Sequence, residues 1–187
     1  MTVRRLAPAD ASAYRTLMLA AYTEAPHAFT STRRERESLP AEWWRERVSS
    51  HPDATQRVFG AFDGSAMVGV AGLRFHTRER TRHKATLFGM YIAPAYRGRG
   101  LGRSLVHASI EAARAEPGVL VLHLTVRESN TPARRLYASC GFETFGVEPM
   151  AVRTNDGGFL ATVHMWREVD PPRDTRGDGR RSTEAGV

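Results

Sequence analysis

The fold is decided by the stretch Tyr91-Ile92-Ala93-Pro94-Ala95-Tyr96-Arg97-Gly98-Arg99-Gly100-Leu101-Gly102-Arg103. The apolar residues 87–92 predict a buried strand that stops at Pro94, because proline has no N–H to donate to a strand ladder. Three glycines follow at alternate positions. Residues 105–113 then place apolar side chains near a 3.6-residue period, which predicts a helix. The sequence therefore predicts a strand, a glycine-rich turn and a helix in succession.

The predicted turn has the properties of an anion-binding site. Glycines let the backbone approach a bulky phosphate, and the free N–H groups at a helix N-terminus favour negative charge. Arg97, Arg99 and Arg103 add positive charge. The turn is not a P-loop, because Gly102 is followed by Arg-Ser, and the glycine spacing does not fit the dinucleotide fingerprint. An arginine- and glycine-rich surface loop is the alternative interpretation.

The pattern that fits is Arg-x-x-Gly-x-Gly, formed by Arg97, Gly100 and Gly102. It resembles the pyrophosphate-binding loop of the GCN5-related N-acetyltransferase (GNAT) superfamily, whose members bind acetyl-coenzyme A. The resemblance implies acetyl-CoA as cosubstrate, its pantetheine arm paired with a strand backbone, and an oxyanion donor near Ile92. The implied cofactor-binding residues are Met90, Tyr91, Ile92, Arg97, Gly98, Arg99, Gly100, Leu101, Gly102 and Arg103, with Asn130 from a second motif.

The second motif lies between residues 124 and 142, where Leu-x-Val-Arg-x-x-Asn precedes Leu-Tyr and then Gly-Phe. It is similar to the GNAT pattern in which an Asn bonds the pantetheine arm and a Leu-Tyr closes the site. The resemblance implies that Asn130 binds the cofactor and that Tyr137 is the catalytic acid. The two are seven residues apart, about two helical turns, so both can face one side. The alternatives are a turn residue before a helix cap for Asn130 and core packing for Tyr137.

The remaining elements indicate an α/β (α+β) protein with a mixed central sheet of about seven strands flanked by about four helices. Strands are predicted at residues 2–6, 57–63, 67–75, 87–92, 119–126, 142–147 and 159–169. Helices are predicted between Pro8 and Pro26 and at residues 41–49, 105–113 and 133–139, the last capped by Thr131. Residues 26–38 are predicted to form a loop.

A helix between the strands 87–92 and 119–126 makes these two strands a parallel pair. The resulting order is the one that the GNAT fold uses, and the resemblance covers roughly residues 2–168. We expect one acetyltransferase domain over residues 1–169. We expect a disordered tail over residues 170–187, which show no periodicity and are rich in Pro, Gly, Arg and Asp.

Composition limits the other classes of function. The formal net charge of +7 comes almost wholly from arginine, since Lys84 is the only lysine. This excess could reflect nucleic acid, an anionic cofactor or a codon bias, and no basic helix with interleaved aromatic residues favours nucleic acid. No apolar run approaches the roughly 20 residues of a membrane span, and the N-terminus lacks a signal-peptide core. The single cysteine, Cys140, favours a reducing cytoplasm. No metal site is predicted, and a homodimer is left open.

The implied reaction is direct transfer of an acetyl group from the thioester to a primary amine, without a covalent enzyme intermediate. Cys140, beside a helix end, is interpreted as a packed residue and not as a nucleophile. The two motifs do not supply the general base that would remove a proton from the amine. The ribosomal-protein alanine acetyltransferases share this loop closely and have Glu where this chain has Thr125, which cannot serve as that base. The remaining candidates, none of them selected, are Glu24, Glu35, Glu37, His76 and His123.

The acceptor is an unidentified amine, and a small molecule is favoured over a peptide N-terminus because of Thr125. A non-catalytic acetyl-CoA-binding or regulatory module is the rival interpretation. Four aromatic residues near the N-terminus could line an acceptor pocket, or could be the buried face of amphipathic helices; they are Tyr22, Phe29, Trp43 and Trp44.

Overall fold

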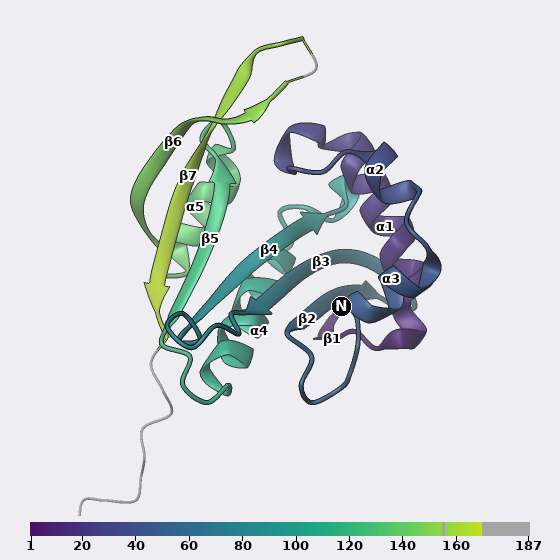
Figure 1. The fold of residues 1–187 in the computed structure, drawn as a ribbon. Helices are drawn as coiled ribbons and strands as arrows, with labels where there is room; N and C mark the ends of the chain where they lie inside the picture. Colours follow the sequence, from purple (N-terminus) through teal and green to yellow (C-terminus); the bar gives the residue numbers. More distant parts are fainter. Residues whose placement is uncertain (155, 170–187) are drawn as a thin grey trace, which may run out of the picture.

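The computed structural model describes residues 1–154 and 156–169. Its central feature is a seven-stranded mixed sheet in the order β1-β2-β3-β4-β5-β7-β6 (Figure 1). The strands are β1 (Thr2–Arg5), β2 (Gln56–Asp63), β3 (Ala66–Phe75), β4 (Lys84–Ile92), β5 (Val121–Arg127), β6 (Glu143–Arg153) and β7 (Phe159–Glu168). All neighbouring strands pair antiparallel except β4 and β5, which confirms the predicted parallel pair.

Within the described residues, five α-helices cover the sheet. They are α1 (Ala11–Glu24), α2 (Arg33–Glu37), α3 (Ala41–Arg47), α4 (Leu101–Arg114) and α5 (Thr131–Ser139). Helices α1 and α3 pack on one face of the β1–β4 half, through a cluster that includes Tyr14, Trp44 and Val70. Helices α4 and α5 pack on the opposite face (Figure 1). The β1–β4 half therefore lies between two layers of helices.

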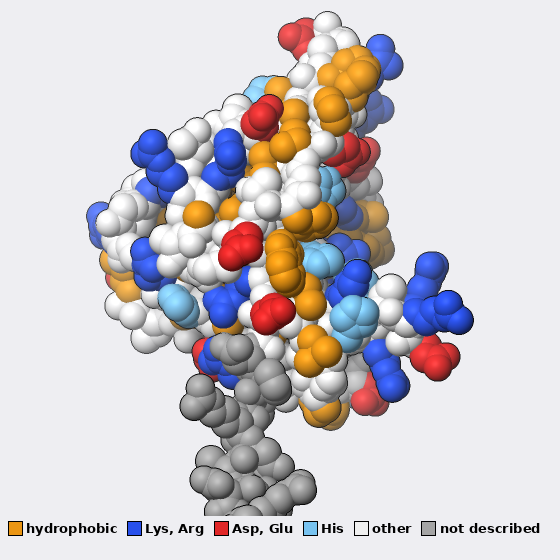
Figure 2. All heavy atoms as spheres, turned by 90° about the vertical axis from the view of Figure 1, so that its left-hand side faces the viewer, with side chains coloured by type: hydrophobic (Ala, Val, Ile, Leu, Met, Phe, Trp, Pro, Cys, Tyr) orange, Lys and Arg blue, Asp and Glu red, His pale blue; other side chains and the backbone are white. Residues whose placement is uncertain are grey.

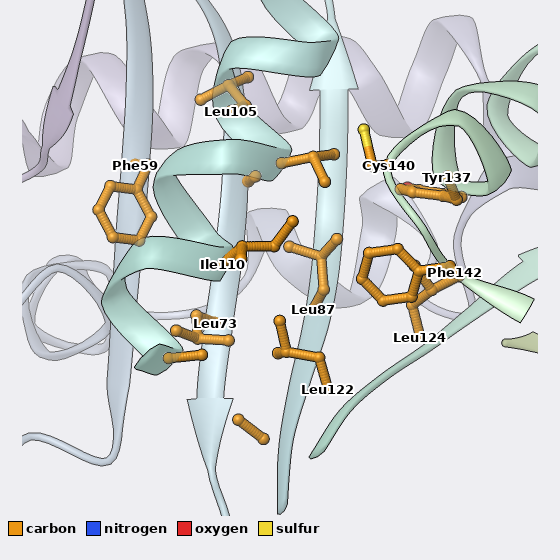
Figure 3. Close-up of a cluster of buried hydrophobic side chains, with 14 of the residues drawn as sticks. Phe59, Leu73, Leu87, Leu105, Ile110, Leu122, Leu124, Tyr137, Cys140 and Phe142 are labelled. Carbon is orange, nitrogen blue, oxygen red and sulfur yellow. The ribbon is translucent and has the colours of Figure 1, made fainter. Parts of the chain in front are cut away.

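The larger hydrophobic cluster joins the two halves of the sheet beneath α4 (Figure 3). Ile110 of α4 lies close to Leu87 of β4, Leu105 and Leu73 belong to the same cluster, and Leu122 continues the cluster onto β5. These side chains are all almost fully buried. The strands beneath α4 alternate their side chains between this cluster and the face toward α1 and α3. Helix α4 begins directly after the glycine turn, so the packing of α4 on the sheet also positions that turn.

Several predicted boundaries were wrong. Residues 33–37, predicted as loop, form α2, whose start is stabilised by a capping box in which Thr32 and Glu35 exchange hydrogen bonds. The cap of α5 is Asn130 and not Thr131, because the Asn130 Oδ1 accepts the N–H of Ala133 at 3.2 Å. Strand β4 begins at Lys84 and β6 extends to Arg153. The predicted tail, residues 170–187, lies outside the described residues.

Strands β4 and β5 diverge after a short parallel contact. Only Lys84, Ala85 and Thr86 pair with β5, opposite residues 121–123. Beyond them the two strands separate like the arms of a V (Figure 1). Backbone groups on the facing edges are thus left without a strand partner along the rest of β4, and a space opens between the halves of the sheet.

The face formed by β5, β7 and β6 carries large apolar side chains that are exposed to solvent. Figure 2 shows a stripe of hydrophobic side chains with histidines beside it on this side of the molecule. Phe145 of β6 is 57% exposed, and Val147, Met150 and Phe159 are also exposed. Exposed apolar stripes are common at interaction surfaces, and the homodimer left open by the sequence stays a prediction. No helix within residues 1–154 and 156–169 has the length and apolar character needed to cross a membrane.

Candidate active site

A cavity of about 640 Å³ lies where β4 and β5 diverge. One end is formed by the glycine turn and the start of α4, and the other end by the 3₁₀ turn Pro26–Ala28 that follows α1. Strand β5 and helix α5 supply the remaining wall. Because the cavity follows the free edge of β4, an extended ligand can run along that edge as an added strand would.

The glycine turn has the conformation that only glycine adopts without strain. Gly98 has φ +74° and Gly100 has φ +80°, both in the left-handed region. Helix α4 begins directly after Gly100, and its first intrahelical bond within the turn is from the Ser104 N–H to the Gly100 carbonyl. The preceding N–H groups of the helix start are therefore available to an anion, as the sequence predicted. Gly102 allows close packing, since a Cβ there would lie 2.9 Å from Leu136 Cδ2.

The three arginines of the turn have different surroundings. Arg97 lines the cavity and its Nε donates to the Ile92 carbonyl at 3.0 Å. Arg103 lines the cavity and donates to both the carbonyl and the hydroxyl of Ser139, which ties α4 to α5. Arg99 is not among the lining residues, and its guanidinium lies 5.2 Å from the Tyr96 ring. Of the three, Arg97 and Arg103 therefore contribute positive charge to the cavity wall.

The β4 wall is shaped by a bulge that the sequence analysis missed. The β3–β4 register shifts at this point, and Gly89 has φ +60°. Residues Met90, Tyr91 and Ile92, which were predicted to bind the cofactor, follow the bulge, and all three line the cavity. A Cβ on Gly72 of β3 would lie 2.5 Å from the Phe88 ring, so the two glycines together let β4 bend. The isolated Gly72 and Gly89 were the available sequence signals.

Asn130 and Tyr137 both line the cavity, which confirms that they share one side of α5. The Asn130 side-chain oxygen is used in the helix cap, so its amide –NH₂ is the group left for a ligand. Tyr137 is only 7% exposed, and its hydroxyl lies 3.4 Å from the Met90 sulfur. Burial raises the pKa of the Tyr137 phenol well above its ordinary value. The phenol is therefore a protonated donor at neutral pH.

The chain matches the model of the acetyltransferase (GNAT) family over residues 17–142. It belongs to this family. It is 35% identical over 109 residues to N-alpha-acetyltransferase RimI of Mycobacterium tuberculosis, covering 58% of this chain and 63% of that protein. It is 32% identical over 124 residues to the L-amino acid N-acetyltransferase AaaT of Escherichia coli K12, covering 66% and 74%.

Among solved structures, the acetyltransferase of the GNAT family from Streptococcus pneumoniae superposes on this GNAT protein with a TM-score of 0.81 and 26% identity, covering 90% of this chain and 99% of that one. The family and fold predicted from the two motifs are thereby confirmed. The curated ribosomal-protein alanine N-acetyltransferases match this GNAT protein over only about half of their length.

The five candidate bases of this GNAT protein are spread over the structure. Glu35 is used in the α2 capping box and Glu37 pairs with Arg33, both on the exposed face of a short helix. His76 bonds the Thr86 hydroxyl at 2.9 Å, and burial lowers its pKa. His123 lies on the open face of β5 beside Phe145. None of these four lines the cavity.

Glu24 differs from the other candidates. It is the last residue of α1, and its Oε2 accepts a 2.5 Å hydrogen bond from the hydroxyl of Tyr91, which lines the cavity. The next residue, Ala25, also lines the cavity. Of the five candidates, only Glu24 is both bonded to a residue that lines the cavity and followed in sequence by another.

Of the four aromatic residues near the N-terminus, one lines the cavity and others form the buried face of the helices. Phe29 lines the cavity and packs edge-on against Tyr22, with ring centroids 4.9 Å apart. Trp44 is almost fully buried against Tyr14. Trp43 packs against Trp44 and lies beneath the guanidinium of Arg47. Of the four, only Phe29 reaches the cavity; the tryptophans support the helices from behind.

Arg127 is a lining residue that lies one position beyond the strand predicted at residues 119–126. It is the last residue of β5 and only 6% exposed. Its Nε donates to the His27 carbonyl at 2.8 Å, Nη1 donates to the Thr162 hydroxyl, and Nη2 makes a longer 3.4 Å contact to the Phe29 carbonyl. Arg127 thereby holds the turn after α1 against β5. Its partners His27 and Phe29 are 100 and 98 residues away in sequence and Thr162 is 35 residues away, and no local pattern indicated them.

Proposed function

We propose that this GNAT protein transfers an acetyl group from acetyl-CoA directly to a primary amine of a small molecule. One observation supports this above others: a buried phenol, Tyr137, lines the cavity that starts at the left-handed glycine turn. The turn would hold the pyrophosphate, and the residues Met90–Ile92 would pair with the pantetheine arm along the free edge of β4. Arg97, Arg103 and Asn130 would add contacts to the cofactor.

The proposed chemistry is a single displacement. The amine nitrogen attacks the thioester carbonyl, and a backbone N–H of β4 near Ile92 stabilises the oxyanion. The C–S bond then breaks, and the coenzyme A thiolate takes the Tyr137 proton, which the phenol regains from solvent. The raised pKa of Tyr137 matches this role, because burial in the same site also raises the basicity of the thiolate. The proton of the attacking nitrogen leaves to a carboxylate or to water.

A small acceptor is favoured over a protein N-terminus by Thr125. This residue lines the cavity but has no acid–base group that works at neutral pH. The two relatives named above carry the names of an N-alpha-acetyltransferase and an L-amino acid acetyltransferase, so both acceptor classes belong in the same assay. The cytoplasmic location is part of this proposal and follows from the single cysteine.

The first experiment measures release of the coenzyme A thiol from acetyl-CoA in the presence of polyamines, aminoglycosides, amino acids or short peptides. Acceleration by a small amine, with the acetylated product identified by mass, supports the proposal. Acceleration only by peptides would overturn the small-molecule acceptor. No acceleration, with acetyl-CoA binding measured in the same sample, would favour the non-catalytic binding module.

Tyr137→Phe separates the enzyme from the binding module. Loss of a general acid lowers kcat by about a hundredfold or more, while acetyl-CoA affinity should stay within twofold because the ring remains. Tyr14→Phe is the matched control, since Tyr14 is equally buried but lies on the far side of the sheet. Equal turnover in Tyr137→Phe and the control would rule out Tyr137 as the acid.

A further inference from the structure

The cavity presents an electrostatic difficulty for an amine substrate. Its charged lining residues are Arg97, Arg103 and Arg127, and no carboxylate lines it within the described residues. Most primary amines are ammonium ions at neutral pH. An acceptor would therefore meet only like charges on the way to the thioester, unless a carboxylate at the entrance compensates.

Glu24 is the carboxylate in the right place. Among the described residues it is the only Asp or Glu whose side chain is hydrogen-bonded to the side chain of a residue that lines the cavity, through the Tyr91 hydroxyl. Tyr91 is buried beneath α1, so it is a firm anchor for the exposed end of the Glu24 side chain. The carboxylate is therefore held at the rim, next to Ala25 and the turn that ends in Phe29.

Glu24 also lacks a cation. Many other carboxylates of this arginine-rich chain are paired, such as Asp10 with Arg4 and Glu116 with Arg57. No arginine, lysine or histidine nitrogen of residues 1–154 and 156–169 lies within 4.0 Å of the Glu24 carboxylate. The Arg97 guanidinium lies 5.9 Å from the Tyr91 ring. The second oxygen of Glu24 is thus free to accept an ammonium.

We propose that Glu24, held by Tyr91, binds the ammonium group of the acceptor at the cavity rim and takes its proton before the attack. This inference rests on the proposed acetyl transfer. The ammonium N–H bond breaks, the proton passes to the Glu24 carboxylate and then to solvent, and the neutral amine keeps the electron pair that attacks the thioester. The acceptor is consequently a cationic amine. The carboxylate that takes its proton comes from α1, whereas the ribosomal-protein alanine acetyltransferases have a Glu at the position of Thr125 in β5.

Tyr91 is a positioning residue in this arrangement. Burial, together with the hydrogen bond and charge of Glu24, raises the pKa of Tyr91 to about 12. The phenol therefore remains protonated and keeps donating to Glu24 throughout the range in which acetyltransferases are assayed. Tyr91→Phe removes this donor and leaves the ring in place, so the carboxylate remains but is no longer oriented.

The test compares Glu24→Gln, Glu24→Asp and Tyr91→Phe with the wild type, using spermidine and L-alaninamide as acceptors. Glu46→Gln, an exposed carboxylate on α3, is the charge-matched control. We expect the Michaelis constant for the amine to rise roughly tenfold in Glu24→Gln, as for loss of one charged hydrogen bond. The Michaelis constant for acetyl-CoA should stay within twofold. The Michaelis constant for the amine should rise less in Glu24→Asp than in Glu24→Gln. In Tyr91→Phe it should lie between the values of the wild type and Glu24→Gln.

The pH provides a readout that a purely structural role would not change. The defect of Glu24→Gln should shrink as the pH rises from 7 toward the pKa of the amine, because the acceptor then arrives already deprotonated. An unchanged Michaelis constant for both amines in Glu24→Gln would overturn the inference. An equal loss at pH 7 and pH 9.5, with a lowered melting temperature, would also overturn it.

A binding measurement separates this inference from the proposed function. Each amine is titrated into protein saturated with coenzyme A, which prevents turnover. Amine binding that weakens about tenfold in Glu24→Gln supports Glu24 as the ammonium receptor, even if the wild type shows no transfer and the proposed function fails. Wild-type binding that Glu24→Gln leaves unchanged would overturn the inference alone. No binding and no transfer with either amine would overturn both.

Discussion

The two ends of the cavity are built by different means. The glycine turn forms its surface from backbone: Gly98 and Gly100 take left-handed conformations, and the start of α4 presents N–H groups. The end near α1 forms its surface from side chains, with Glu24 oriented by Tyr91 and the 3₁₀ turn held by Arg127. The first end is complete within about seven consecutive residues; the second needs residues 67 and 100 positions apart.

This difference suggests why one end can be shared by a family and the other can vary. A backbone cradle tolerates many neighbouring side chains as long as the glycines remain. A rim assembled from side chains on α1, β4 and β5 changes with each substitution in those elements. Cofactor binding should therefore resist most mutations outside the turn, whereas acceptor binding should depend on packing far from the cavity.

The largest effect is expected for Trp44→Ala, which removes the support behind the acceptor end. Trp44 is almost fully buried and packs against Tyr14 and Trp43. Replacing a buried tryptophan by alanine costs about 3–5 kcal/mol, measurable by urea unfolding. The folded fraction should still bind acetyl-CoA, since the glycine turn lies on another element. A loss below about 1 kcal/mol would show that α3 is not needed to support this end.

Gly100→Ala tests the backbone end. The φ of +80° would place an L-residue in the left-handed region at about 1–2 kcal/mol of stability. Since Gly100 lines the cavity, acetyl-CoA affinity should fall as well. Gly146→Ala is the matched control, because it adds the same methyl to β6 with open space around it and without a positive φ. Comparable losses in both variants would refute the conformational argument.

Asn130→Ala tests a residue that serves both structure and site. Loss of the side-chain cap to the Ala133 N–H should cost about 1 kcal/mol. Thr131→Ala should cost less, because Thr131 is the first helical residue and not the cap. Thermal unfolding of the two variants gives the order directly. A larger loss of stability in Thr131→Ala than in Asn130→Ala would support Thr131 as the cap of α5, as predicted from the sequence.

The smallest effect is expected at Asp10, the residue that directly precedes α1. The hydrogen bond from Arg4 holds the pKa of the Asp10 carboxyl below its usual value. This pair therefore contributes stability at pH values above about 4, the unfolded value, and loses it as the pH falls through the lower folded pKa. Because the Arg4 side chain is half exposed to water, Asp10→Asn should cost under about 1 kcal/mol at pH 7. Urea unfolding at pH 7 and pH 3 should show the difference between variant and wild type shrinking in acid; a constant difference would contradict it.

Most strands and long helices followed from periodicity, and both motifs lay in the predicted places. Helix α2 was missed because its five charged residues have no apolar period, although Thr32 and Glu35 had the spacing of a capping box. The bulge at Gly89 was missed because a single glycine in a strand does not say whether the strand bends. The burial of Arg127 was missed because arginine is ordinarily exposed.

The sequence by itself determined the family, the order of the elements and the glycine turn at one end of the cavity. These depend on short-range rules: alternating glycines permit one kind of turn, and apolar periods of two and 3.6 residues specify strands and helices. Only the tertiary structure decided which of five candidate carboxylates and histidines bonds to a residue that lines the cavity. Glu24 meets Tyr91 across 67 residues because α1 packs on the face of β4. That contact depends on the packing of whole elements, which no local pattern records.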